Sequence, residues 1–439
     1  MRIAPARLLV AIVFVDALGT GTFAAVSVVF FQRHSHVTGT QLGLALSIGG
    51  VAGLVVPSVV TALVDRLGTK VVAVAVNLLL VPAFLALILV RGFGWLVAVL
   101  AIALALQRCN DPIRRVTVTE LVPHHEQMRL QAMVRTASNG GIAIGALAAV
   151  PALVVSSDSA LVATVAADAL TFLLAAGGSI SLPARGALVV RSRTTKAAAG
   201  PLQSGSRLAA RAARAPCDPQ FVVLSVLMGA LGVTEQIILV GIPLLVLTLP
   251  HSLHALIGVS LGLNTVVVLT RQLAVARDVE TLPDAFRSLR IGAAQLAAGC
   301  LLLGLAAVLV GHAVVAAPIL LVSVIVLSLS EVRVSAAASG VFLHTSGRRG
   351  TGRSQAVLTL GVNLRNLAGP LLVAFVAADV GAPGWLVLAA VCVTAIPVTR
   401  CFRGQAGSDS RGSGWRKRKI ARADRCHRRE WPDRAPGGR

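Results

Sequence analysis

Charged side chains are scarce in this chain. Asp, Glu, Lys and Arg make up 13% of its 439 residues, whereas 56% are hydrophobic and the mean hydropathy is +0.82. Soluble domains carry roughly 25% charged residues, so this composition excludes a soluble protein of one to three domains. Apolar chain crosses a bilayer only as helices that satisfy their own backbone hydrogen bonds, with roughly 20 residues per crossing. The composition therefore predicts an all-α membrane protein.

Other scarce features exclude further classes. Aromatic residues make up only 4% of the chain and tyrosine is absent, which argues against a cavity that stacks sugars on rings. The six cysteines show neither CxxC pairs nor metal-ligand spacing, so they indicate no disulfide framework and no metal centre. The chain lacks a Gly-rich phosphate loop and a recognisable nucleophile-base set. We therefore predict no cofactor, no direct use of ATP and no enzymatic activity.

Twelve apolar runs divide the chain into two halves. They cover roughly residues 8–31, 40–63, 71–90, 94–119, 129–155, 159–182, 220–249, 252–274, 289–310, 313–343, 354–379 and 383–402. This pattern predicts twelve transmembrane helices, six on each side of a basic segment. The predicted parts are an N-terminal bundle (1–182), a basic linker (183–219), a C-terminal bundle (220–402) and a basic disordered tail (403–439).

The basic residues predict the orientation of these helices. The formal net charge is +22, but the cations lie between the apolar runs and in the tail rather than in a nucleic-acid-binding patch. Cytoplasmic loops retain Lys and Arg. With both termini in the cytoplasm, Arg33 and Arg91 are the only cations in the outer loops. Because Arg is preferred over Lys and Ala and Val abound, as in high-GC genomes, we expect a bacterial inner membrane.

An internal repeat supports two related halves. Residues 129–151 align with 353–375, and the Ala-Leu-Gly sequence at 17–19 meets the same sequence at 230–232. A duplicated six-helix unit leaves this kind of in-register similarity. The identical pairs are Arg129 with Arg353, Gln131 with Gln355, Ala132 with Ala356, Asn139 with Asn363, and Gly145 with Gly369.

A charged turn lies between the second and third runs. It reads Leu-Val-Asp-Arg-Leu-Gly-Thr-Lys over residues 63–70. A short connection needs Gly68 to turn sharply, and Asp65 is placed to cap a helix or pair with a basic group on the facing bundle. A conformational latch and a simple orientation signal both fit this turn. The predicted latch residues are Asp65, Arg66, Gly68 and Lys70.

This turn resembles the signature of the major facilitator superfamily, although Thr61 and Thr69 replace a Gly and an Arg of that pattern. The segments 120–123, 135–141 and 168–173 are similar to bacterial efflux members of the enterobactin-exporter-like and macrolide-efflux-like branches. The resemblance implies two six-helix bundles around a central cavity and alternating access of that cavity, driven by proton antiport. Span five lacks the Pro of the antiporter motif, and its glycines, with Gly369-Pro370 in the other half, permit close helix contact or a bend.

Asp16 is the first candidate for proton coupling. It lies about nine residues into the first run, or roughly 14 Å at 1.5 Å per residue, near the middle of a ~30 Å hydrocarbon core. No residue of opposite charge lies within one turn of its own helix. An unpaired carboxyl group at that depth is suited to carry a proton. A protonated carboxyl group that only bonds a neighbouring helix is the alternative.

Two further acids lie within predicted spans. Glu235 holds a comparable place in the second half and is a candidate for proton sharing or for contact with a cationic substrate. Gln236 beside it is expected to turn to another helix face. Glu331 in span ten serves either as a gate or proton site or as an ion-pair partner of Arg333 or Arg135. Asp168 is expected to have a structural role.

Polar residues of spans four, five and eleven are candidates for the substrate cavity. An arginine inside a membrane span must pair or contact substrate. Arg108 and Arg114 of span four face either the cavity or, by snorkelling, the inner surface. The predicted cavity residues are Arg365, Arg135, Asn139, Asn363, Gln107 and Arg108.

These observations predict a secondary active transporter that exports a small drug-like or secondary-metabolite compound in exchange for protons. Import of a small nutrient or lipid-like solute and a non-transporting membrane sensor are the alternatives. The expected partners are a small-molecule substrate, protons and the lipid bilayer, without nucleic acid and with a monomer as the expected state.

Overall fold

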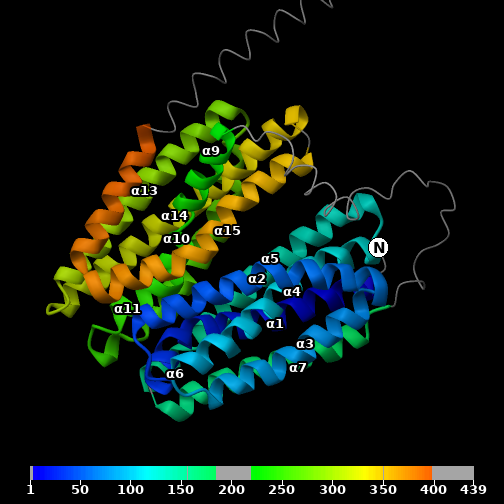
Figure 1. Ribbon diagram of the computed structural model, residues 1–439, viewed down its shortest axis with the longest axis horizontal. Coiled ribbons are helices and arrows are strands. Elements are labelled where there is room, and N and C mark those ends of the chain that lie inside the picture. The colour runs from blue at the N-terminus through cyan, green and yellow to red at the C-terminus, as the bar shows by residue number, and fades with distance from the viewer. Residues whose placement is uncertain (1–2, 156, 184–218, 350, 398–439) are drawn as a thin grey trace, which may run out of the picture.

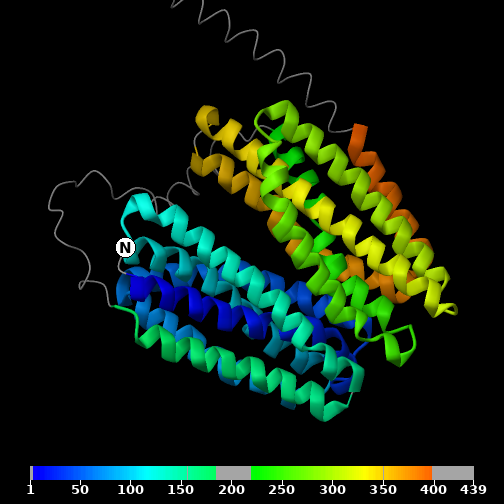
Figure 2. The ribbon, with the colours of Figure 1, turned by 180° about the vertical axis from the view of Figure 1, so that it is seen from behind.

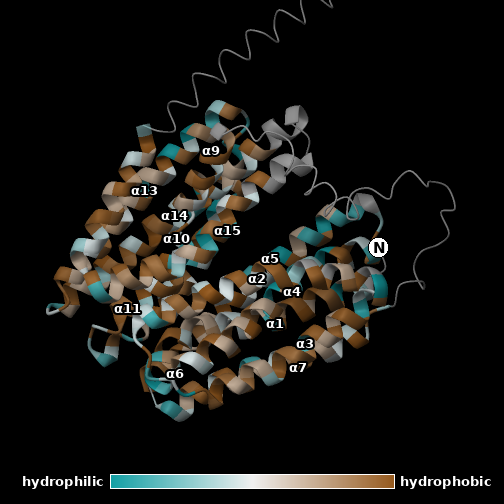
Figure 3. Ribbon diagram, viewed as in Figure 1, coloured by the Kyte–Doolittle hydropathy of each residue, from teal (hydrophilic) through white to brown (hydrophobic). Residues whose placement is uncertain are grey.

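The computed structural model describes residues 3–155, 157–183, 219–349 and 351–397. These residues form helices and no strands. Eleven of the helices are long and apolar enough to cross a membrane, and a further apolar helix, Ala382–Pro397, is shorter within the described part. Apolar residues run along the helices, while hydrophilic residues lie mainly at helix ends and in connections (Figure 3). The prediction of an all-α fold with twelve membrane helices is confirmed.

The first half of the chain forms one bundle of antiparallel helices, here the N bundle. Its helices are α1 (Ile3–His34), α2 (Gly39–Leu67), α3 (Thr69–Leu89), α4 (Phe93–Leu121), α5 (His124–Ala148), α6 (Val150–Val155) and α7 (Asp158–Ile180). Short connections separate them, and side chains cap several helix starts. Thr38 and Gln41 form a capping box at α2, and the Ser157 hydroxyl accepts from the Ala160 N–H at α7.

The second half forms the C bundle. Its elements are α9 (Pro219–Leu231), α10 (Thr234–Gln236), the π-helix η1 (Ile237–Gly241), α11 (Ile242–Val246), η2 (His251–Leu253), α12 (Leu256–Arg277), α13 (Leu282–Val308), α14 (Ala313–Arg349), α15 (Thr351–Phe375), the π-helix η3 (Val376–Val380) and the helix 382–397. Thr281 and Asp284 form the capping box of α13. The predicted linker and tail fall almost wholly on residues 184–218 and 398–439, outside the described residues, so the domain boundaries stay a prediction.

The seventh span is not the continuous helix that its apolar run predicted. It ends as an α-helix at Leu231, turns at Gly232 and Val233, and continues through α10 and η1 into α11. Pro243 gives a physical reason for the π-helix, because a proline ring clashes with the carbonyl four residues earlier and a wider turn relieves that clash. Irregular backbone at membrane depth is tolerated where it lines a cavity.

The two bundles meet at one end and diverge at the other. The near end is defined here as the end where α1, α5, α9 and α15 begin, and the far end as the opposite one. Seen from both sides, the bundles touch near the far end and spread apart toward the near end (Figures 1 and 2). Side-chain contacts agree, since Arg33 lies 2.5 Å from His251 and Thr40 donates to Asp379 across this end.

Small residues let the bundles approach closely in their far halves. A Cβ at Gly43 of α2 would lie 2.5 Å from Ala374 Cβ and 2.7 Å from the Pro370 carbonyl oxygen of α15. At a second contact between the bundles, a Cβ at Gly258 of α12 would lie 2.6 Å from the Ala146 carbonyl oxygen of α5. Without a hydrophobic driving force between helices in lipid, such close backbone packing is what associates them.

Candidate functional site

A central cavity of about 210 Å³ lies between the two bundles. From the N bundle, Gln107 and Arg108 of α4 line it beside α1 and α2, and the Gln107 amide donates to the Thr20 hydroxyl at 3.3 Å. From the C bundle, Glu235, Gln236 and Asn366 contribute polar groups. Gln236 lines the central cavity together with Glu235, but its side chain lies against Gly369, whereas Glu235 pairs with Arg365 and also lines a second cavity.

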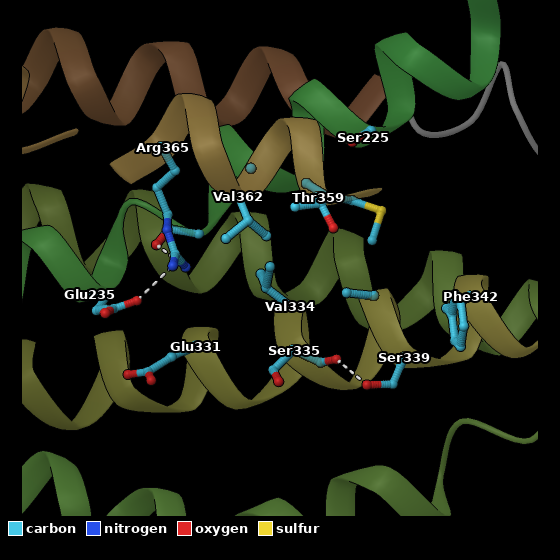
Figure 4. Close-up of a pocket in the computed structure, with 14 residues that line it drawn as sticks. Ser225, Glu235, Glu331, Val334, Ser335, Ser339, Phe342, Thr359, Val362 and Arg365 are labelled. Carbon is cyan, nitrogen blue, oxygen red and sulfur yellow. Dashed lines mark hydrogen bonds and ion pairs between the residues drawn. The ribbon is translucent and has the colours of Figure 1, made fainter. Parts of the chain in front are cut away.

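A second cavity of about 430 Å³, here the C-bundle pocket, lies among α9, α14 and α15. Its volume is within the range of small-molecule sites, roughly 300–1,000 Å³. Figure 4 shows its lining, with carboxylates and a guanidinium at one end and hydroxyl groups and Phe342 toward the other. Glu235 lines both this pocket and the central cavity.

Arg365 is paired within the C bundle. Its Nη2 lies 2.9 Å from Glu235 Oε2, Nη1 donates to the Gly232 carbonyl oxygen at 3.4 Å, and Nε donates to Asn366 Oδ1 at 3.3 Å. The Gly232 carbonyl also accepts from the Glu235 N–H at 3.4 Å, in the turn that interrupts the seventh span. An arginine at membrane depth needs such partners, and here they fix the guanidinium beside the cavity.

Glu331 of α14 faces the same pocket through a different contact. The Asn264 amide of α12 donates to its Oε2 at 3.0 Å. Among the described residues, neither Arg333 nor Arg135 lies within ion-pair distance of Glu331, so the predicted alternative of an ion pair with one of them is wrong. Glu331 thus presents a carboxyl group, held by an amide, to the C-bundle pocket.

Asp16 is buried in the N bundle but it is not unpaired. Its Oδ2 accepts from Arg114 Nη2 of α4, while Oδ1 has no hydrogen-bond partner within the part of the chain that the structure describes. Its own helix carries no cation nearby, and the neighbouring helix supplies one, so the expectation of an unpaired carboxylate is wrong. Arg114 also lies 3.9 Å from Asp111 at the rim. Asp168 of α7 is fully buried, with Oδ1 accepting from Thr171 at 3.2 Å.

The other predicted site residues are distributed unevenly. Of the substrate candidates, Gln107, Arg108 and Arg365 line one of the two cavities, whereas three others line neither of them. These three are Arg135, Asn139 and Asn363. The described residues hold no group of three or more His, Cys, Asp or Glu side chains arranged for a metal ion.

The predicted latch lies at the near end. Gly68 joins α2 to α3 with φ of 87°, in the left-handed region that a sharp turn of this kind requires. Arg66 is exposed and Lys70 is half-buried, while the side chain of Asp65 lies outside the described residues. The role of these residues as a latch stays a prediction.

Sequence reasoning missed the roles of four residues of these sites. Arg114 is the partner of Asp16, Asn264 is the partner of Glu331, and Asn366 and Gln236 line the central cavity. Buried amides within apolar runs were the available signal, because an amide at membrane depth needs a partner or a cavity. Which face of its helix each one occupies depends on helix rotation, and apolar periodicity leaves that rotation loosely defined.

Two bundles of membrane helices around polar cavities have the architecture of a secondary transporter. The sequence profile of the Major Facilitator Superfamily matches residues 9–307, more than half of the chain. The chain therefore belongs to the Major Facilitator Superfamily. No curated protein matches it significantly in sequence.

Solved structures share this fold at low sequence identity. The nucleoside transporter NupG superposes with a TM-score of 0.70 at 14% identity, covering 91% of this chain and 99% of that one. The xylose transporter XylE from E. coli, in a partially occluded inward-open conformation, gives 0.63 at 13%, with 91% and 98% covered. A bacterial homologue of the human lysosomal transporter Spinster, inward-facing, gives 0.63 at 14%, with 91% and 95% covered. At these identities the likeness concerns the fold alone.

Proposed function

We propose that this protein is a proton-driven exporter of a small drug-like or secondary-metabolite compound in the bacterial inner membrane. The observation that carries the proposal is the position of Glu235, which lines both the cavity between the bundles and the C-bundle pocket. A carboxylate in that position is a site that a proton and a cationic group occupy in turn. Such competition is the simplest physical basis for exchanging one for the other.

The conformation supports a cycle of alternating access. The far halves of the bundles are in contact and the near ends are apart (Figure 1). With both termini in the cytoplasm, as the basic loops favour, this conformation faces inward and collects substrate from the cytoplasmic side. The turn at 65–70 then acts as the latch of the opposite state, in which the near ends meet.

Asp16 is the proposed proton carrier of the N bundle, with Glu235 and Glu331 as the corresponding groups of the C bundle. Its ion pair with Arg114 does not remove this role, because a proton that reaches the carboxylate releases the guanidinium and so couples protonation to helix packing. Import of a small solute is the second candidate function, since the cavities by themselves do not indicate the direction of transport.

The test measures efflux of a panel of fluorescent and antibiotic compounds from cells, with and without an uncoupler. We compare the wild type, Asp16→Asn and the control Asp158→Asn, whose carboxylate is exposed at the first turn of α7. Efflux that an uncoupler abolishes, and that only Asp16→Asn loses, supports the proposal. Efflux insensitive to both treatments refutes proton coupling through Asp16, and accumulation instead of efflux selects import.

A further inference from the structure

A third cavity of about 330 Å³ opens on the side of the C bundle, here the lateral pocket. It lies between α9, α15 and the helix 382–397 and is lined almost entirely by aliphatic side chains. Leu364 and Leu372, which are 46% and 45% exposed, lie in a candidate membrane span, and Val391, which is 58% exposed, lies in the shorter apolar helix 382–397. The rim of the lateral pocket therefore faces the lipid rather than water.

The wall between the lateral pocket and the C-bundle pocket is thin. Gly229 of α9 and Arg365 of α15 line both cavities. Gly229 packs directly on the backbone of Gly361, since an added Cβ would lie 2.7 Å from Gly361 Cα. Arg365 lies in the same wall, beside the interruption at Gly232, and its side chain is 20% exposed. The backbone contact at Gly229 and the Arg365 side chain thus lie between the lateral pocket and the C-bundle pocket.

Acidic groups outnumber basic groups on the inner side of this wall. Glu235 and Glu331 contribute two carboxylates to the C-bundle pocket, and Arg365 contributes one guanidinium (Figure 4). Among the described residues no cation lies within ion-pair distance of Glu331. A ligand with a positive group complements this excess, and one with a negative group does not.

We propose that the transported compound is an amphiphilic cation that reaches the site from the bilayer. Its apolar part occupies the lateral pocket, and its cationic group passes Arg365 to Glu331 in the C-bundle pocket. This proposal rests on the proposed export function, because it names the class of compound exported and its route. Aliphatic lining on one side of Arg365 and the acidic groups Glu235 and Glu331 on the other are the two halves of an amphiphile site.

The test is photolabelling of the purified full-length protein in lipid nanodiscs, which requires no transport. The probes share a dodecyl chain with a diazirine and differ only in the head group, which is trimethylammonium, tetraethylene glycol or sulfate. Ala230→Trp fills the lateral pocket, and Val223→Trp places the same ring on the same face of α9, two turns outside it. Val391→Trp fills the pocket from the opposite wall if Ala230→Trp does not fold.

We expect the ammonium probe to label residues 227–233, 364–372 or 388–395 about tenfold more strongly than the other two probes. Ala230→Trp or Val391→Trp should reduce that labelling about tenfold, since either ring excludes the chain, and Val223→Trp should leave it unchanged. Glu331→Gln should remove the preference for the ammonium head. Equal labelling by all three probes, or labelling that both pocket-filling variants leave unchanged, would overturn the proposal. A protein that binds the probe here but exports nothing would refute the export function and leave this site standing.

Discussion

The contact between α2 and α15 at Gly43 yields the sharpest prediction about conformation. A Cβ there would lie 2.5 Å from Ala374 Cβ and 2.7 Å from the Pro370 carbonyl oxygen. Carbon atoms pack at roughly 3.5–4.0 Å, so Gly43→Ala forces the two helices apart by about 1 Å. The strain exists only while the far ends of the bundles touch. It therefore disfavours the observed state and leaves the opposite state unaffected.

The size of this effect follows from measured overpacking in close-packed interiors. One inserted methyl group costs about 1–3 kcal/mol, which corresponds to a change of about 5- to 150-fold in a two-state equilibrium. We expect Gly43→Ala to move the population by that factor toward the conformation that is open at the far end. Gly177→Ala is the control, because nothing lies within 4 Å of the added Cβ on α7.

Distances between spin labels measure the shift. The pair at Trp95 and Val314 reports the far end, and the pair at Met128 and Leu273 reports the near end; all four positions are strongly exposed. Native cysteines are replaced first. In Gly43→Ala the far-end distance should lengthen as the near-end distance shortens. Unchanged distance distributions, or longer distances at both ends, would refute the inference that the contact between α2 and α15 holds the far ends closed.

Two further predictions follow from single contacts. The Ser47 hydroxyl accepts from the Leu371 N–H at 3.2 Å across the same contact between α2 and α15. Ser47→Ala should therefore destabilise the state with closed far ends by about 0.5–1.5 kcal/mol. The spin-label distances should shift in the same direction as in Gly43→Ala, but by less. Arg114→Met leaves Asp16 buried without its cation, which should cost about 3–5 kcal/mol and lower the melting temperature in detergent. Adding Asp16→Asn to Arg114→Met should restore most of that loss, and a double variant no more stable than the single one would contradict the pairing.

The membrane fold could be predicted because hydropathy acts on each helix separately. A run of about 20 apolar residues crosses a bilayer whatever its neighbours are, so the apolar runs located the helices without any knowledge of their packing. Helix ends shifted by a few residues, as α1 does in extending from residue 3 to 34. The interruption at Gly232 was missed because hydropathy does not register backbone hydrogen bonding.

The site was predicted only as a set of positions. Asp16, Glu235, Glu331 and Arg365 were found because charges at membrane depth are costly and therefore informative. Their partners were not found, since Arg114 is 98 residues from Asp16 in sequence and lies on another helix. Pairing between helices depends on their rotation and on small residues that set their approach, and neither is encoded in the period of apolar residues.

Asn366 connects the two parts of the proposed mechanism. Its side-chain Oδ1 accepts from Nε and Nη2 of Arg365, and Nη2 also pairs with Glu235 in the C-bundle pocket. Its backbone carbonyl lies against Gly50 of α2, where an added Cβ would come within 2.7 Å. One residue thus contacts both the charged site and the seam that holds the far ends together. Energetic coupling between two sites needs a contiguous element that has two arrangements. A change of charge at Glu235 that moves Arg365 acts directly on Asn366.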